Sequence, residues 1–66
     1  MNTMIRNFTA IIMTVEGADV ERRSLNETNV HKANAKLWHI INYEYSSRDD
    51  LAGYVLPEYN NSSLTF

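Results

Sequence analysis

The sequence predicts an α+β fold in which one helix packs on one face of an antiparallel sheet of about four strands. Three observations support this class. Residues 5–15 are rich in β-branched residues, apolar residues recur at helical spacing after residue 26, and extended runs follow near the C-terminus. A chain of 66 residues without cysteine has no disulfide to stabilise it. It therefore reads as a single domain of residues 1–66, stabilised by its apolar core or by a partner chain.

The first predicted strand runs from Ile5 to Val15, and its polar members include threonines that tolerate a pleated surface. Both of its faces are apolar, with Phe8, Ala10 and Ile12 on one and Ile11, Met13 and Val15 on the other. This pattern predicts a central strand, or one whose second face meets a partner. Residues 16–19 supply a turn, in which Gly17 can take a positive φ without strain.

The next two elements are a polar strand and the helix. Residues 20–25 form the returning strand, on which Arg22 and Arg23 lie on opposite faces, so at least one is solvated or ion-paired. The helix is expected to begin near Asn26 or Thr28, because either side chain can accept a hydrogen bond from the first turn. An apolar stripe for packing on the sheet consists of Val30, Ala33, Leu37 and Ile40 or Ile41, while Asn29, Lys32 and Lys36 face water.

Residues 40–45 can be read either as two more helical turns or as a strand. We favour a strand from about Ile40, because isoleucine and tyrosine suit a pleated surface. Residues 46–50 then form a turn, and residues 51–56 a final strand that Pro57 stops or places at an edge. Residues 60–66 have the composition of a loose tail. The expected order is strand, strand, helix, strand, strand.

No motif in the chain indicates catalysis, a metal or a cofactor. His31 and His39 are eight residues apart, too far for an i, i+4 metal pair. Asp49 and Asp50, with Glu44 and Glu58, suggest a solvated turn more than a magnesium site, and Ser46 or Ser47 with His39 lacks any flanking oxyanion hole. Two glycines cannot build a phosphate loop. We expect a protein that is not an enzyme, with no catalytic, metal or cofactor residues.

Partner and location are inferred from charge and length. No apolar run reaches the roughly 20 residues that a membrane span needs, and Glu16 stands where signal-peptide cleavage after Ala18 requires a small residue. The lack of cysteine fits a cytoplasmic protein. A sheet with exposed tyrosines can stack nucleic-acid bases, but a net charge of −2 opposes phosphate binding. We expect neither a membrane nor direct nucleic acid as partner.

The acidic half of the chain carries the predicted binding surface. Residues 37–66 contain one arginine against four carboxylates, a net charge of −3, and they hold Trp38 and all four tyrosines. Tyr and Trp often anchor protein interfaces, and carboxylates around them steer a surface toward a basic partner. The predicted partner-binding residues are Tyr43, Glu44, Tyr45, Asp49, Asp50, Tyr54 and Glu58. The alternative interpretation places Trp38 and two of the tyrosines in the core.

In size, slight acidity and element order, the chain resembles the small inhibitors that bacteriophages direct against host machinery, including anti-CRISPR proteins and inhibitors of host RNA polymerase. The resemblance rests on the strand Phe8–Val15, the helix capped at Asn26, the strand containing Tyr43 and the strand Leu51–Leu56. It implies a protein that occludes the nucleic-acid or partner-binding surface of a larger enzyme, such as a CRISPR effector, nuclease or polymerase, in a host cytoplasm. The second hypothesis is an antitoxin-like or scaffold homodimer that pairs through residues 8–15.

Overall fold

The computed structural model describes residues 4–59 and confirms the α+β class. Its elements are β1 (Ile5–Thr14), β2 (Asp19–Ser24), α1 (Val30–His39), a π-helical turn η1 (Ile40–Glu44) and β3 (Leu51–Tyr59). The sheet is antiparallel, with strand order β2-β1-β3. The predicted central position of the first strand is confirmed. In the described part of the chain the sheet has three strands rather than four.

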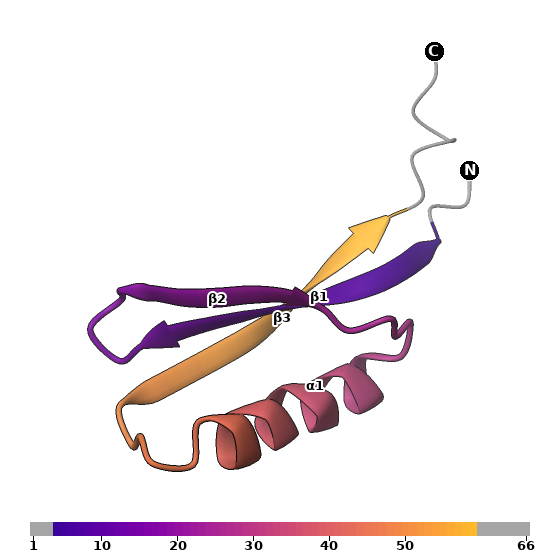
Figure 1. The fold of residues 1–66 in the computed structure, drawn as a ribbon. Helices are drawn as coiled ribbons and strands as arrows, with labels where there is room; N and C mark the ends of the chain where they lie inside the picture. The colour runs from indigo at the N-terminus through magenta and orange to yellow at the C-terminus, as the bar shows by residue number, and fades with distance from the viewer. Residues whose placement is uncertain (1–3, 60–66) are drawn as a thin grey trace.

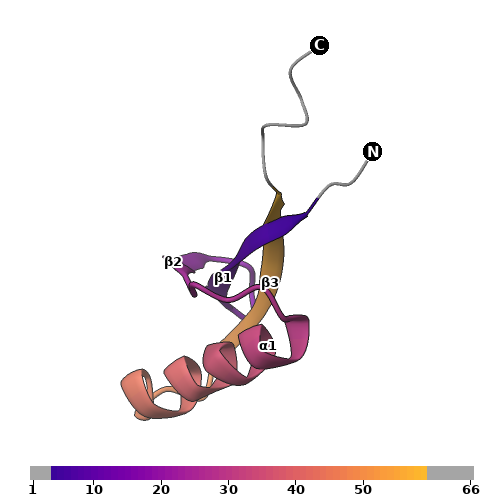
Figure 2. The same cartoon turned by 90° about the vertical axis from the view of Figure 1, so that its right-hand side faces the viewer.

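The helix lies along one face of the sheet and leaves the other face open (Figures 1 and 2). Strand register fixes which residues point each way, because successive side chains alternate between faces. Gly53, opposite Ile12, lies against Leu37 of α1. Ile11 and Tyr54, one position along their strands, therefore point to the open face. We use the name open face for the side of the sheet away from α1.

The core lies between the sheet and the helix. Its buried members are Phe8, Ala10, Ile12, Leu25, Ala33, Leu37, Ile40 and Ile41. The three β1 residues of this set are those that the alternation of residues 5–15 assigned to one face. Gly53 allows the helix to come close. A Cβ at this position would lie 3.0 Å from both the Ile11 carbonyl oxygen and Leu37 Cδ1.

The prediction of a strand from Ile40 to Tyr45 is wrong. Residues 40–44 continue α1 as the π-helical turn η1, and the chain then turns toward β3. Both Ile40 and Ile41 are buried in the core next to Leu37. A strand would have sent these two neighbours to opposite faces, whereas a continuing helix buries both. Core packing therefore outweighs the intrinsic β preference of this segment.

The helix begins later than expected. Its N-cap is Asn29, whose Oδ1 accepts hydrogen bonds from the amides of His31 at 2.9 Å and Lys32 at 3.1 Å. Neither Asn26 nor Thr28 is the cap, and Val30 is half-exposed instead of joining the core. Asn26 instead adopts a φ of 53° in the loop after β2, a left-handed conformation that asparagine tolerates better than most residues.

The strand ends also show small differences. β1 stops at Thr14, one residue early, and β2 begins at Asp19. A register shift between Ile12 and Met13 leaves Val20 as an extra residue, packed against the core. β3 runs through Pro57 to Tyr59, which is consistent with the edge position that the sheet order gives it. The predicted tail of residues 60–66 lies outside the described residues.

Candidate functional site

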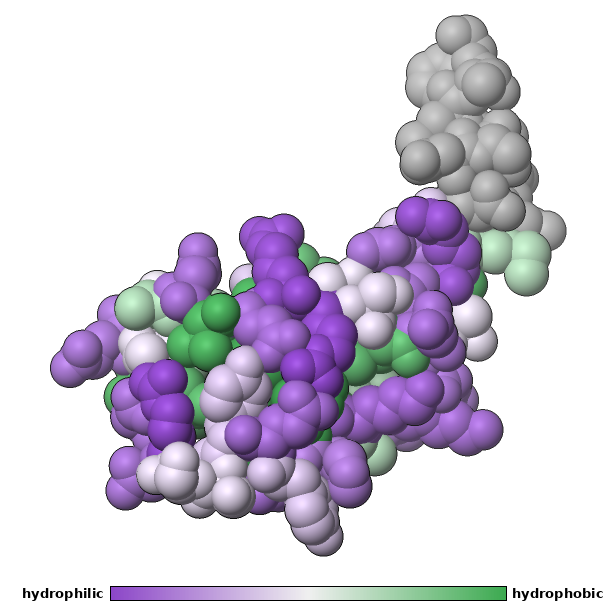
Figure 3. Space-filling view, viewed as in Figure 1, coloured by the Kyte–Doolittle hydropathy of each residue, from purple (hydrophilic) through white to green (hydrophobic). Residues whose placement is uncertain are grey.

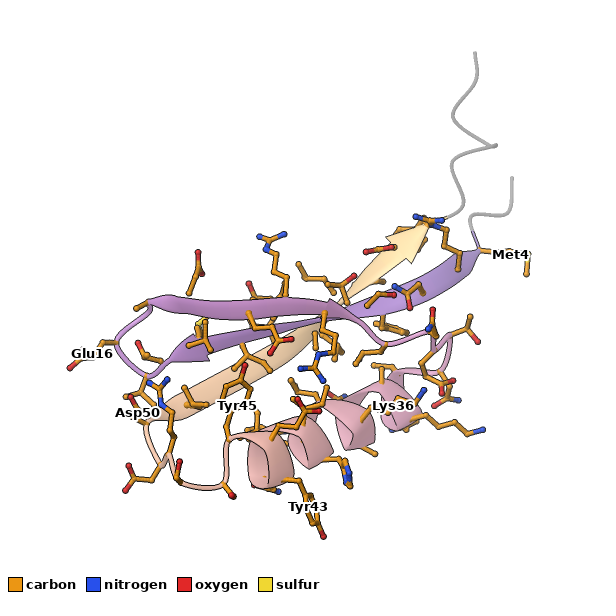
Figure 4. The ribbon with its side chains drawn as sticks, viewed as in Figure 1. Met4, Glu16, Lys36, Tyr43, Tyr45 and Asp50 are labelled. Carbon is orange, nitrogen blue, oxygen red and sulfur yellow. The ribbon has the colours of Figure 1, made fainter. Side chains whose placement is uncertain are left out.

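Two turns meet at one end of the molecule and bring carboxylates together. The Val15 amide donates to the Asp50 carbonyl oxygen at 2.8 Å, which joins the β1–β2 turn to the loop before β3. Gly17 makes the first turn feasible with a φ of 98°. Figure 4 shows Glu16 and Asp50 at this end, far from Met4. We name it the acidic end and define it by Val15, Glu16, Asp19, Asp49 and Asp50.

The acidic end combines an apolar centre with charges that are mostly unpaired. Val15 leaves 70% of its surface exposed. Asp50 pairs with Arg48 at 2.8 Å, and the hydrogen bond from Arg48 lowers the pKa of the Asp50 carboxyl. Within residues 4–59, Glu16, Asp19 and Asp49 form no ion pair. Four carboxylates and one guanidinium thus give this end a charge of about −3 at neutral pH.

Two of the predicted site residues in the η1 region are bound within the fold. The Tyr45 hydroxyl donates to Glu21 on β2, and Arg23 donates to both carboxylate oxygens of Glu44 at 2.7 Å. Arg23 also contacts Glu21 at 2.7 Å. These contacts tie η1 to β2 and orient Tyr45 toward the sheet (Figure 4). Tyr45 and Glu44 therefore help to hold η1 against β2.

Tyr43 is the freest of the predicted aromatic residues. Its ring stacks on His39 with a centroid separation of 4.3 Å, and 70% of its surface is exposed. Figure 4 shows it pointing away from the sheet. It therefore lies on the outer side of the helical segment, while Tyr45 lies on the inner side.

We expect the stability of the fold to depend on pH because of the contacts among Glu21, Arg23, Glu44 and Tyr45. Hydrogen bonds from Arg23 and Tyr45 lower the pKa of Glu21, and Arg23 lowers that of Glu44, from an ordinary value of 4.5. A carboxyl whose pKa is lower in the folded state stabilises the fold above its unfolded pKa. That contribution is lost as the pH falls below about 4.5 toward the folded-state values.

We expect Arg23→Gln to lower the urea midpoint at pH 7 and to reduce the fall in midpoint between pH 7 and pH 3. The variant removes the cation that favours the ionised carboxylates, so the two folded-state pKa values move back toward 4.5. Urea titrations followed by circular dichroism measure this. Lys32→Gln, which removes an exposed cation without an ion pair in the described residues, is the control. An Arg23→Gln acid profile parallel to that of the wild type contradicts the assignment.

Tyr54 and Glu58 lie on β3, away from the acidic end. Tyr54 is opposite Ile11 on the open face and is 44% exposed. Glu58 accepts hydrogen bonds from Thr9 and from Asn7, the latter at 3.4 Å, and contacts Arg6 at 3.5 Å. The Thr9 and Asn7 bonds lower the pKa of Glu58. Of the seven predicted residues, Asp49 and Asp50 therefore belong to the acidic end and the other five lie elsewhere.

Three members of the acidic end were missed from the sequence. Val15, Glu16 and Asp19 lie 30 or more positions before Asp49, and only the antiparallel pairing of β1 with β3 brings them together. The alternation of residues 5–15 concealed Val15, because it assigned this residue to the second apolar face of the strand. A division of the chain into basic and acidic halves concealed Glu16 and Asp19, because both fall in the half with more cations.

The described residues contain neither a pocket nor a group of three or more side chains suited to a metal ion. His31 and His39 are both exposed on α1. Within residues 4–59, no helix has the length and apolar character needed to cross a membrane. Hydrophilic side chains separate small hydrophobic areas on the surface seen in Figure 3.

Comparison with known proteins found no match to a family model, a curated protein or a solved structure.

Proposed function

We propose that this chain is a non-enzymatic protein-binding module whose acidic end contacts a basic surface on a larger protein. The observation that carries the proposal is the meeting of two turns around an exposed valine, with three carboxylates that have no ion pair in the described residues. An apolar centre inside a charged rim is the usual composition of a protein interface. The carboxylates supply long-range attraction, and Val15 supplies area to bury.

The proposed partner is an enzyme that processes nucleic acid, such as a CRISPR effector, a nuclease or a polymerase. Such enzymes hold nucleic acid in basic channels, because phosphate neutralisation dominates that affinity. A surface with a charge of about −3 is complementary to such a channel. The module therefore inhibits by occlusion, as the resemblance to phage inhibitors implies, and acts in the cytoplasm of the host cell.

The test compares Asp49→Lys with a variant of equal net charge. Asn34→Lys combined with Asn42→Lys adds the same two charges on exposed positions of the helical segment. Tagged wild-type protein captures the partner from lysate at low salt, and surface plasmon resonance then measures the kinetics. We expect Asp49→Lys to slow association by about tenfold at low salt, with dissociation nearly unchanged, because steering acts on the encounter rate.

Competition supplies the second readout. A nucleic-acid duplex that binds the captured enzyme should displace the module if both use one basic surface. Equal association rates for Asp49→Lys and the paired asparagine variant would contradict the acidic end as the contact surface. Simultaneous binding of duplex and module would contradict occlusion.

A further inference from the structure

The open face carries apolar and cationic side chains that no described element covers. Met13, Tyr54 and Leu56 lie on it with Arg22, and Tyr54 and Leu56 are 44% and 41% exposed. Ile11, at the centre, is only 3% exposed although α1 is on the other side of the sheet. Its cover must come from neighbours on the same face, and the register puts Arg22 and Tyr54 on either side of it.

Arg22, unlike Arg23, has no ion-pair partner in the described part of the chain and is therefore available to a partner molecule. Arg23 is satisfied by Glu21 and Glu44 within the fold. Arg22 is exposed and forms no ion pair or side-chain hydrogen bond among residues 4–59. It lies level with Tyr54 on the far side of β1. One face thus presents a free guanidinium on one side of Ile11 and a half-exposed aromatic ring on the other.

We infer that a second copy of this chain packs on the open face, so that Arg22 of each copy lies over Tyr54 of the other. A two-fold axis parallel to β1 and passing over Ile11 places β2 of one copy above β3 of the second. Because Arg22, Ile11 and Tyr54 are level in the register, this operation superposes the guanidinium on the aromatic ring twice. Arginine over an aromatic face is an attractive pair, and the axis passes over Ile11, which each copy already buries beneath its own neighbouring side chains.

The Arg22 guanidinium also favours this axis over the other face-to-face arrangement. An axis perpendicular to the strands would place β2 over β2 and bring the two Arg22 guanidinium groups together at the level of Ile11. The sheets of a sandwich are about 10 Å apart, so these like charges would be held close and partly desolvated. The parallel axis replaces that repulsion with two complementary pairs, in an aligned sandwich of the usual kind.

The arrangement keeps the acidic ends of both copies at one end of the dimer, because rotation about an axis parallel to β1 does not reverse the strands. The dimer therefore presents two carboxylate-rimmed surfaces on one side. Neither Arg22 nor Tyr54 belongs to the acidic end. The inference goes beyond the proposed function and does not depend on it.

The test measures self-association by sedimentation equilibrium over a series of protein concentrations. Wild type, Arg22→Tyr, Tyr54→Arg and the double exchange Arg22→Tyr with Tyr54→Arg are compared. Tyr54→Arg places two guanidinium groups opposite one another, and Arg22→Tyr replaces each cation–π pair with an aromatic pair, whereas the exchange rebuilds both cation–π pairs with their sides reversed. We expect Tyr54→Arg to raise the dimer Kd by about tenfold or more, Arg22→Tyr to raise it less because aromatic pairs also attract, and the exchange to return it to within about threefold of wild type.

Two controls separate the interface from folding and from partner binding. Tyr43→Ala removes an equally large ring on the helix side, and Asp49→Lys alters the acidic end; neither should weaken the dimer. Circular dichroism of each variant establishes that it is folded. A wild type that is monomeric at all concentrations overturns the inference, as does a folded exchange variant that fails to recover. Loss of partner binding by Asp49→Lys with an intact dimer shows that the two surfaces are separate.

Discussion

Truncation of Leu37 to alanine should lower the free energy of unfolding by about 3–4 kcal/mol, within the usual range for a buried leucine. Leu37 has no exposed surface and lies at the centre of the interface between α1 and the sheet. Its Cδ1 reaches the backbone at Gly53, so the side chain fills the closest point between the two layers. A cavity there cannot collapse easily, because the strands around it are fixed by their ladder.

Trp38→Ala is the matched control for this change. Tryptophan is the larger residue and lies next to Leu37 on the same helix, but 45% of it is exposed. We expect its truncation to cost clearly less than that of Leu37. Urea unfolding of both variants, followed by circular dichroism, gives the two free energies. An equal or larger loss from Trp38→Ala would show that the ring packs in the core, as the alternative interpretation of the aromatics proposed.

The helix shows which features of this fold were readable from sequence. Ala33 and Leu37 were assigned to the core by their spacing, and both are buried. The secondary structure after residue 39 could not be predicted from the sequence, because Ile40 and Ile41 are compatible with either a strand or a continuing helix. The choice depends on the sheet above them, since only the helical path puts both side chains against it. That information is tertiary, so propensity gave the wrong answer.

The candidate site shows a similar division. Asp49 and Asp50 were selected from composition, and the structure places them at an exposed end. Their neighbours Glu16 and Asp19 follow only from the register of β1 with β3, which no single segment encodes. The ion pair of Glu44 could not be predicted from the sequence either. Glu44 was selected with them, but its bond to Arg23 requires η1 and β2 to be adjacent.

Replacement of Gly53 by valine should destabilise the protein by about 2–3 kcal/mol, as overpacking of a filled interface does. A Cβ at Gly53 would lie 3.0 Å from the Ile11 carbonyl oxygen and 3.2 Å from Ile41 Cδ1. The isoleucine methyl can move, but the carbonyl belongs to the central strand and cannot shift without disturbing its ladder. Gly53→Ala should show the same sign with a smaller loss, because the first added carbon already makes this contact.

Ala52→Val separates this clash from general effects of a branched residue on β3. Ala52 is adjacent to Gly53 but lies opposite Met13 on the open face. Valine has a high preference for strands, so Ala52→Val should not destabilise β3. Replacing a glycine also reduces the conformational freedom of the unfolded chain, which can stabilise the folded state by up to about 1 kcal/mol. Gly53→Val must overcome that gain to destabilise. Urea unfolding at micromolar protein concentration measures both variants. A Gly53→Val protein as stable as wild type would mean that α1 does not approach β3 this closely.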